Sequence, residues 1–187
     1  MTDTRAKLRN AAVELIAERG FRGATTKLIA ERAGVNEVTL FRHFGNKYGL
    51  VLAAFRYSTK DINQVVSEPS GDLEGDLVRL ARAYTTLTMS NRGAVTRLIP
   101  EMHHNEIVKN SFGKLFDKAA NDVIGLFEYY VKLGELKKDN ATNLAMAFLG
   151  PMLTRVFLSH LLEDDSSFDI ERYVQDYLYG RSARNKS

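Results

Sequence analysis

Helical periodicity is the feature that most constrains the fold of this chain. Apolar residues recur three or four positions apart along most of its length, and between residues 107 and 131 they return every four positions. Only three prolines interrupt the pattern, at positions 69, 100 and 151, and much of the remaining chain consists of strong helix formers. The sequence therefore predicts an all-α protein with about nine helices.

Local start and stop signals set the expected helix boundaries. The first helix should be capped by Asp3 or Thr4 and should end at Gly20, and Pro151 should kink or end the helix that contains it. A turn-forming segment, residues 67–72, should end a long helix over residues 47–66. The other expected helices cover residues 26–33, 37–43, 73–90, 93–102, 107–131, 140–162 and 168–179.

Two absences narrow the class of protein. The chain contains no cysteine, which excludes disulfides, thiolate catalysis and sulfur-ligated metal sites. The first residues lack the apolar core of a signal peptide, and the longest apolar run, 144–153, is far shorter than the roughly 20 residues of a membrane span. We therefore expect a cytoplasmic protein without a membrane anchor, whose helix at 144–162 is deeply buried or packed against another chain.

Positive charge is concentrated in the first third of the chain. Residues 1–60 contain eleven Lys or Arg and five Asp or Glu, whereas residues 61–187 contain fifteen and eighteen. A basic module joined to a mildly acidic body is typical of a protein that binds a polyanion at one end. Charge alone fits a membrane surface as well as nucleic acid.

Two of the expected short helices, joined by residues 33–36, fit a helix-turn-helix. Gly34 can adopt the left-handed conformation that the tight turn needs, Val35 can fill the gap between the helices, and Asn36 can cap the second helix. On that second helix Leu40 and Phe44 share the inward face. The outward side chains, which are the candidate readers of DNA bases, are Glu37, Val38, Phe41 and Arg42.

The stretch from Gly20 to Leu50, GFRGATTKLIAERAGVNEVTLFRHFGNKYGL, resembles the TetR family of bacterial repressors. The resemblance rests on the aromatic residue after glycine, the Thr-Thr pair, IAERAGV, TLFRHF and Lys47, and the rest of the chain agrees with the family in length and helix pattern. It implies a DNA-binding domain over residues 1–46 and a helical regulatory and dimerisation domain over 47–187, joined by the helix 47–66. The implied function is a homodimeric repressor that a small ligand releases from a palindromic operator.

The resemblance also implies roles for matching positions. Glu37, Val38 and Phe41 would face base edges. Asn36, which directly precedes them, belongs to the same set of DNA-binding residues. Glu37 can accept a hydrogen bond from cytosine N4, and Val38 can contact a thymine methyl group. The implied phosphate ligands are Thr25, Thr26, Lys27, Thr39, Arg42, His43 and Lys47, of which Lys47 would combine its own charge with the N–H groups of a helix start.

Three places depart from the family pattern. Glu37 and Val38 stand where Lys-Gly is common, and Phe41 stands where Tyr is common, so the family's operator preferences do not carry over. Leu28 stands in place of an acidic residue, which leaves Thr25 to cap its helix alone.

The second part of the chain should bind a ligand and a second copy of itself. The dimer is expected through the last two helices, residues 140–162 and 168–179, with Val174 in the interface. A small apolar or aromatic ligand is expected in this part, although the candidate lining residues are also the types that fill ordinary cores. These candidates are Tyr84, Met89, Arg97, Met102, His103, Phe112, Phe116, Phe127, Phe148 and Met152.

Two other functions stay open from the sequence. One is a constitutive or architectural DNA-binding protein without a ligand. The other is a metal-dependent helical enzyme that would use His103, His104 and Glu106, but adjacent histidines do not place both imidazoles on one helix face. We therefore expect no catalysis, no metal and no cofactor. The operator sequence, the ligand and the sign of regulation are also open.

Overall fold

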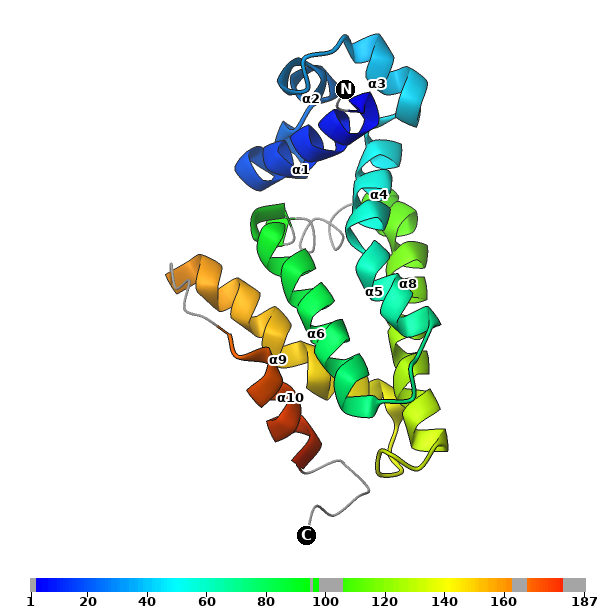
Figure 1. Cartoon of the computed structure of the whole chain (residues 1–187). Helices are drawn as coiled ribbons and strands as arrows, with labels where there is room; N and C mark the ends of the chain where they lie inside the picture. The colour runs from blue at the N-terminus through cyan, green and yellow to red at the C-terminus, as the bar shows by residue number, and fades with distance from the viewer. Residues whose placement is uncertain (1–2, 95, 98–105, 163–167, 180–187) are drawn as a thin grey trace. The chain divides into compact units, whose positions relative to one another are not determined.

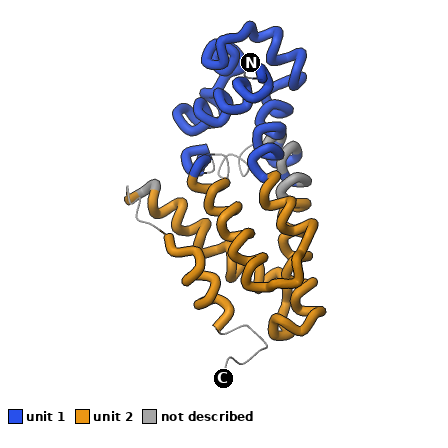
Figure 2. Tube along the Cα trace, in the orientation of Figure 1, with its two compact units in different colours: residues 1–59, 90–115 blue, residues 60–89, 116–187 orange. Residues whose placement is uncertain are grey.

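The computed structural model of the chain describes residues 3–94, 96–97, 106–162 and 168–179. The chain forms two compact units, one of residues 1–59 with 90–115 and the other of residues 60–89 with 116–187 (Figure 2). The elements of the described part are all helices, so the predicted all-α class is confirmed.

The first unit begins with four helices, α1 (Thr4–Gly23), α2 (Thr26–Arg32), α3 (Glu37–Phe44) and α4 (Lys47–Ser58) (Figure 1). Both α1 and α3 pack against α2 and against α4. Each helix contributes fully buried aliphatic side chains to one small core, among them Leu15, Ile29, Leu40 and Leu50. Their side-chain caps are Asp3, Thr25, Asn36 and Asn46.

The first helix is interrupted where the sequence predicts its end. Gly20 has a φ of 71° and a ψ of 171°, which a residue with a Cβ rarely adopts, and one further turn follows it. That turn buries Phe21, which is 3% exposed, beside the start of α4. On the other side of the break, α1 closely approaches the segment after residue 90, because a Cβ at Gly93 would lie 2.8 Å from Cβ of Ala17.

The prediction of one long helix over residues 47–66 is wrong. α4 ends at Ser58 and α5 (Lys60–Ser67) begins after Thr59, whose φ and ψ are −90° and 1°. The Ser58 hydroxyl donates to the carbonyl of Ala54 over 3.1 Å and the Thr59 hydroxyl to that of Arg56 over 3.3 Å. Hydroxyls that bond to the preceding turn compete with the helical backbone and favour a bend.

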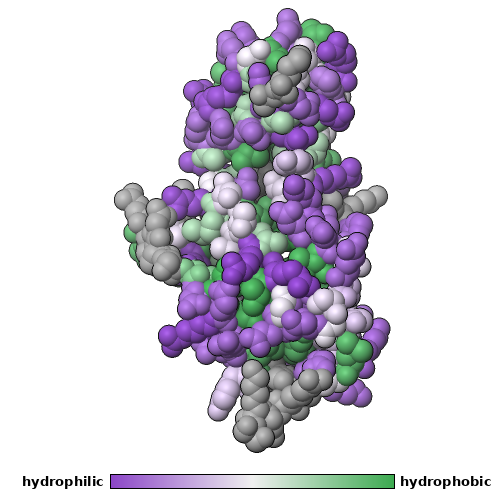
Figure 3. Space-filling view, viewed as in Figure 1, coloured by the Kyte–Doolittle hydropathy of each residue, from purple (hydrophilic) through white to green (hydrophobic). Residues whose placement is uncertain are grey.

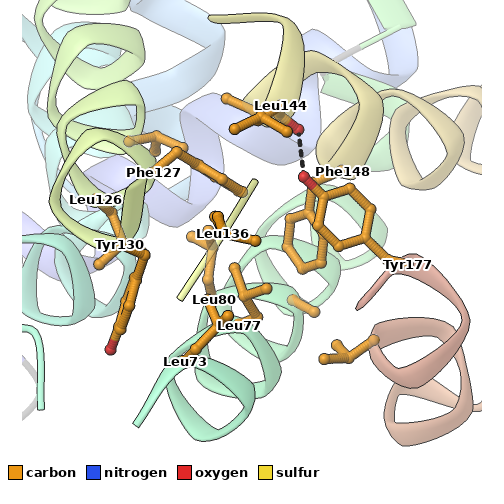
Figure 4. Packing of buried hydrophobic residues seen from close by; sticks show 14 of the residues in the cluster. Leu73, Leu77, Leu80, Leu126, Phe127, Tyr130, Leu136, Leu144, Phe148 and Tyr177 are labelled. Carbon is orange, nitrogen blue, oxygen red and sulfur yellow. Dashed lines mark hydrogen bonds between the residues drawn. The ribbon is translucent and has the colours of Figure 1, made fainter. Parts of the chain in front are cut away.

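The second unit is built from α5, α6 (Leu73–Ser90), most of α8 (Glu106–Lys132), α9 (Ala141–Leu162) and α10 (Ile170–Tyr179). Its core contains a group of fully buried aromatic side chains (Figure 4). The ring centroids of Phe127 and Phe148 lie 5.8 Å apart, and those of Phe148 and Tyr177 4.9 Å apart. The Tyr177 hydroxyl donates to the Leu144 carbonyl over 2.9 Å, so α10 is tied to α9 by polar as well as apolar contacts.

A buried carboxylate fixes the segment between α5 and α6. Asp76 has no exposed surface and accepts hydrogen bonds from the Ser70 N–H over 2.9 Å and the Ser70 hydroxyl over 2.8 Å. The Tyr130 hydroxyl and the Arg79 guanidinium also donate to it. A buried charge needs such donors, and here they tie the predicted turn segment to α6 and α8.

The remaining boundaries follow the sequence closely. α6 and α8 match their predicted ranges to within a residue, and Asn140 caps α9 by accepting from the Thr142 N–H over 2.9 Å. α9 runs on through Pro151, so the proline ends no segment. Of the helix predicted over 93–102, residues 93–94 and 96–97 are helical, and the others lie outside the described residues.

Candidate nucleic-acid interface

The turn between α2 and α3 holds α3 in a defined orientation. Gly34 has a φ of 68°, as the sequence predicts, and the N–H of Val35 donates back to the Ala30 carbonyl over 3.0 Å. The Asn36 side chain accepts from the Val38 N–H over 2.9 Å, which leaves its amide N–H₂ for other partners. Together with the fully buried Leu40, these bonds fix which side chains of α3 face outward.

The outward face of α3 carries the predicted base readers. Val38 is 70% exposed and Phe41 is 45% exposed, and Arg42 is also exposed. Glu37 is half-buried. Most of the surrounding surface of the first unit that Figure 3 displays is hydrophilic, with small apolar areas among the polar side chains.

The predicted phosphate ligands of α2 lie at its first turn. Thr25 is the exposed N-cap, and its Oγ1 accepts from the Leu28 N–H over 3.3 Å. A hydroxyl that accepts one hydrogen bond still has its own hydrogen to donate, which is what a phosphate oxygen requires. Thr26 is half-buried and Lys27 exposed.

Lys47 lies at the start of α4, as predicted, but it also has a structural contact. Its Nζ donates to the carbonyl of Phe21 over 2.8 Å and lies 4.2 Å from the centroid of the Phe21 ring. The side chain therefore joins the beginning of α4 to the end of α1. Since an ammonium group has three donor hydrogens, the bond to Phe21 is compatible with a phosphate contact.

The other two predicted phosphate ligands of α3 are half-buried. Thr39 lies on the first half of the helix, and His43 lies on its last turn, where its ring centroid is 6.2 Å from that of Phe44.

Sequence reasoning missed one cation near α3. The guanidinium carbon of Arg5, at the start of α1, lies 5.3 Å from the centroid of the Phe44 ring at the end of α3. Arg5 is exposed, so its charge adds to that of Arg42 near this end of the helix. No local pattern in the sequence links residues so far apart, and only the packing of α1 brings them together.

A second arginine of the first unit has a structural role instead. Arg32 on α2 forms a two-pronged ion pair with Glu18 on α1, with N–O distances of 2.7 and 2.9 Å, and Glu14 lies 3.5 Å away. The hydrogen bond from Arg32 holds the pKa of Glu18 below its ordinary value. This pair joins the first two helices of the unit.

The predicted ligand-lining residues are not gathered around one described cavity. Phe127, Phe148 and Met152 are buried in the core of the second unit. Tyr84 and Met89 are half-buried, and burial raises the pKa of Tyr84 to about 12. Arg97 is exposed, Met102 and His103 lie outside the described residues, and so do the side chains of Phe112 and Phe116.

Two further places bear on ligands and metals. A groove of about 540 Å³ lies between α5 and α6, and none of the predicted residues lines it; its walls are Asp61, Gln64, Val65, Glu68, Arg79, Arg82, Ala83 and Thr86. For the alternative metal site, His103 and His104 lie outside the described residues, and Glu106 is 3.6 Å from the Lys109 ammonium.

One side of α9 is partly exposed in the described part of the chain. Met146 is 68% exposed and Phe157 is 37% exposed, and Gly150 between them has open space where a side chain would project. Helical spacing places these residues on one face together with Leu153. By length and composition Ala141–Ser159 could cross a membrane, and 28% of that stretch is buried in the protein.

The prediction that Val174 lies in a dimer interface is wrong. Val174 on α10 has no exposed surface and belongs to the core of its own chain. The apolar spacing on α10 marks the face that packs inward, and its exposed positions, such as Glu171, Arg172 and Asp176, are mostly charged.

Comparisons with known proteins agree with this arrangement. Residues 8–54 match the family described as bacterial regulatory proteins, tetR family. YvkB, an HTH-type transcriptional regulator of Bacillus subtilis (strain 168), is 33% identical over 126 residues, which are 66% of this chain but only 59% of that protein.

Solved structures share the fold along nearly the whole chain. GusR of Salmonella enterica has a TM-score of 0.75 at 22% identity, covering 95% of this chain and 94% of that one. FadR from Bacillus subtilis, in complex with stearoyl-CoA, has a TM-score of 0.70 at 18% identity, covering 92% and 95%. The family match thus covers α2, the turn and α3, which makes this part of the chain similar to the TetR family of bacterial regulatory proteins, and the rest of the described fold follows the plan of these solved structures.

Proposed function

We propose that this chain is a DNA-binding transcriptional regulator, and more specifically a cytoplasmic, homodimeric repressor that a small molecule releases from a palindromic operator. The observation that carries the proposal is the outward face of α3, which is fixed by the Gly34 turn and the Asn36 cap and lies within a basic unit. A helix presented in this way can enter the major groove with its first turn toward the bases.

The proposed contacts fall into two classes. Glu37, Val38 and Phe41 face the bases, and Asn36 orients them through the cap. The side chains around them contact phosphates and set the register on the duplex without reading sequence. These are Thr25, Thr26, Lys27, Thr39, Arg42, His43 and Lys47, to which we add Arg5 because of its contact with Phe44 at the end of α3.

The dimer interface is proposed on α9, with α10 as its neighbour. The partly exposed apolar face formed by Met146, Gly150, Leu153 and Phe157 would be covered by the same face of a second copy, and the absence of a side chain at Gly150 lets two helices approach closely. Two α3 helices related by a two-fold axis then meet two half-sites of a palindrome.

Ligand control is proposed for the second unit. FadR of Bacillus subtilis was solved with stearoyl-CoA, which makes acyl-CoA molecules the first class to test beside small aromatic compounds. The half-buried Tyr84 and Met89 support a site in this unit. The filled core around Phe127, Phe148 and Met152 favours the second candidate, a repressor that works without a ligand.

Selection of bound sequences from a random DNA pool tests the main proposal. A palindrome is expected, and its half-site spacing reports the separation of the two α3 helices. A pool without any preferred sequence would contradict the proposal. Thermal-shift measurements with acyl-CoA and aromatic compounds then separate the two candidates, since only a ligand-controlled regulator should gain stability and lose operator affinity with the same compound.

A further inference from the structure

Two large apolar side chains stand exposed on the recognition face of α3. Within the described residues 3–44, Val38 at 70% and Phe41 at 45% are the only large apolar side chains that are exposed. The outward face of a surface helix is normally polar. Val38 in particular makes no contribution to the core of the unit, so its apolar surface is left for a partner.

The two side chains lie close enough to act on neighbouring bases. They are three residues apart, which places them on one face of the helix about 4.5 Å apart along its axis. Base pairs repeat about every 3.4 Å along DNA. The bond from the Val38 N–H to Asn36 fixes the first turn, so the pair is held before DNA arrives.

Neither side chain can donate or accept a hydrogen bond, which limits what it can recognise. Among the groups that base pairs expose in the major groove, the 5-methyl group of thymine is the apolar one. Phe41 lacks the hydroxyl that a tyrosine would offer to a phosphate. The apolar side chain of Val38 cannot form a hydrogen bond with a polar base edge.

We infer that Val38 and Phe41 read methyl groups, so that each operator half-site carries thymines on neighbouring steps under these two side chains. The inference rests on the proposed DNA-binding function and narrows the class of operator. Removal of one methyl group should weaken binding about fourfold, the equivalent of about 0.8 kcal/mol for one buried carbon. In a symmetric dimer the same change in both half-sites should cost about fifteenfold.

Deoxyuridine supplies the test, because it differs from thymidine only in the missing methyl group. The full-length dimer is titrated with its selected operator, and with copies in which deoxyuridine replaces symmetric thymines one position at a time. Two positions should show the loss. Val38→Ala should bind the thymine operator more weakly and lose its preference over deoxyuridine at one of them, and Phe41→Ala at the other.

A matched control separates methyl recognition from general weakening. Arg42→Ala, on the same exposed face, should weaken binding to both operators and keep their ratio. Equal affinity of the unaltered protein for thymine and deoxyuridine operators would overturn the inference while leaving the proposed function intact. So would undiminished preference for thymine in both alanine variants. If the random pool yields no preferred sequence, the proposed function fails and the inference fails with it.

Discussion

Lys47 allows the structural and DNA-binding roles of one side chain to be measured separately. Its ammonium group holds the carbonyl of Phe21 over 2.8 Å and lies over the Phe21 ring. A hydrogen bond that involves a charged group contributes about 1.5–3 kcal/mol, and because Lys47 is half-exposed we expect the lower end of that range. Lys47→Ala should therefore lower the free energy of unfolding by about 1.5 kcal/mol in a denaturant titration.

The effect on DNA binding should appear in the salt dependence. Each phosphate contact adds about 0.9 to the slope of log affinity against log salt, and a dimer loses two contacts in Lys47→Ala. The slope should fall by about 1.8, so that between about 50 and 200 mM salt the unaltered protein loses about twelvefold more affinity than the variant. The measurement is a fluorescence anisotropy titration at several salt concentrations, with operator and with random DNA.

Two variants serve as controls. Lys27→Ala removes an exposed cation from α2 and should reduce the salt slope in the same way with little change in stability. Lys47→Arg keeps the charge and should keep the slope. An unchanged slope in Lys47→Ala, together with the expected loss of stability, would show that Lys47 only joins α4 to α1, and the phosphate assignment would be refuted.

Three further predictions concern assembly and stability. Phe157→Glu should convert the dimer to a monomer in light scattering and abolish tight operator binding. The control Leu133→Glu, which changes a residue 53% exposed just after α8, should leave the dimer intact. If Phe157→Glu stays dimeric, the interface lies elsewhere. The pKa of Glu18 is held below its ordinary value near 4.5 by its hydrogen bond with Arg32. The stabilisation from this ion pair is therefore present above that pH and is lost as pH falls through the lowered pKa. The melting temperature of Glu18→Gln should consequently depend less on pH below about 4.5 than that of the unaltered protein. Phe148→Ala should cost about 3–5 kcal/mol in chemical denaturation, since the ring is fully buried, and a cost below about 1 kcal/mol would mean that the aromatic core is looser than described.

Local sequence signals predicted what short-range interactions decide. Asp3, Thr25 and Asn36 cap the helices that they were expected to cap, because a side-chain oxygen two or three residues before an N–H group needs no help from the rest of the fold. Gly34 adopts its positive φ for an equally local reason. The outward positions of α3 followed from helical spacing and the inward position of Leu40.

The features that the sequence did not predict have two causes, an ambiguous local signal at Thr59 and contacts between distant residues at α10 and Arg5. The break at Thr59 is stabilised by hydroxyl bonds that a continuous helix could also have formed, so spacing alone could not reveal it. The inward face of α10 could not be told from an interface, since an apolar stripe shows only that something covers it, and Val174 is covered by its own chain. Arg5 reaches Phe44 through tertiary packing alone.

The close approach of Gly93 to Ala17 limits how freely this protein can be recombined with its relatives. The compact unit that contains α1 to α4 also contains residues 90–115, so a graft of residues 1–59 onto another body transfers an incomplete unit. With Cβ of Ala17 only 2.8 Å from where a Cβ at Gly93 would lie, a larger residue at either position would force the two segments apart. A working chimera should therefore exchange both segments together, or keep glycine and alanine as a matched pair.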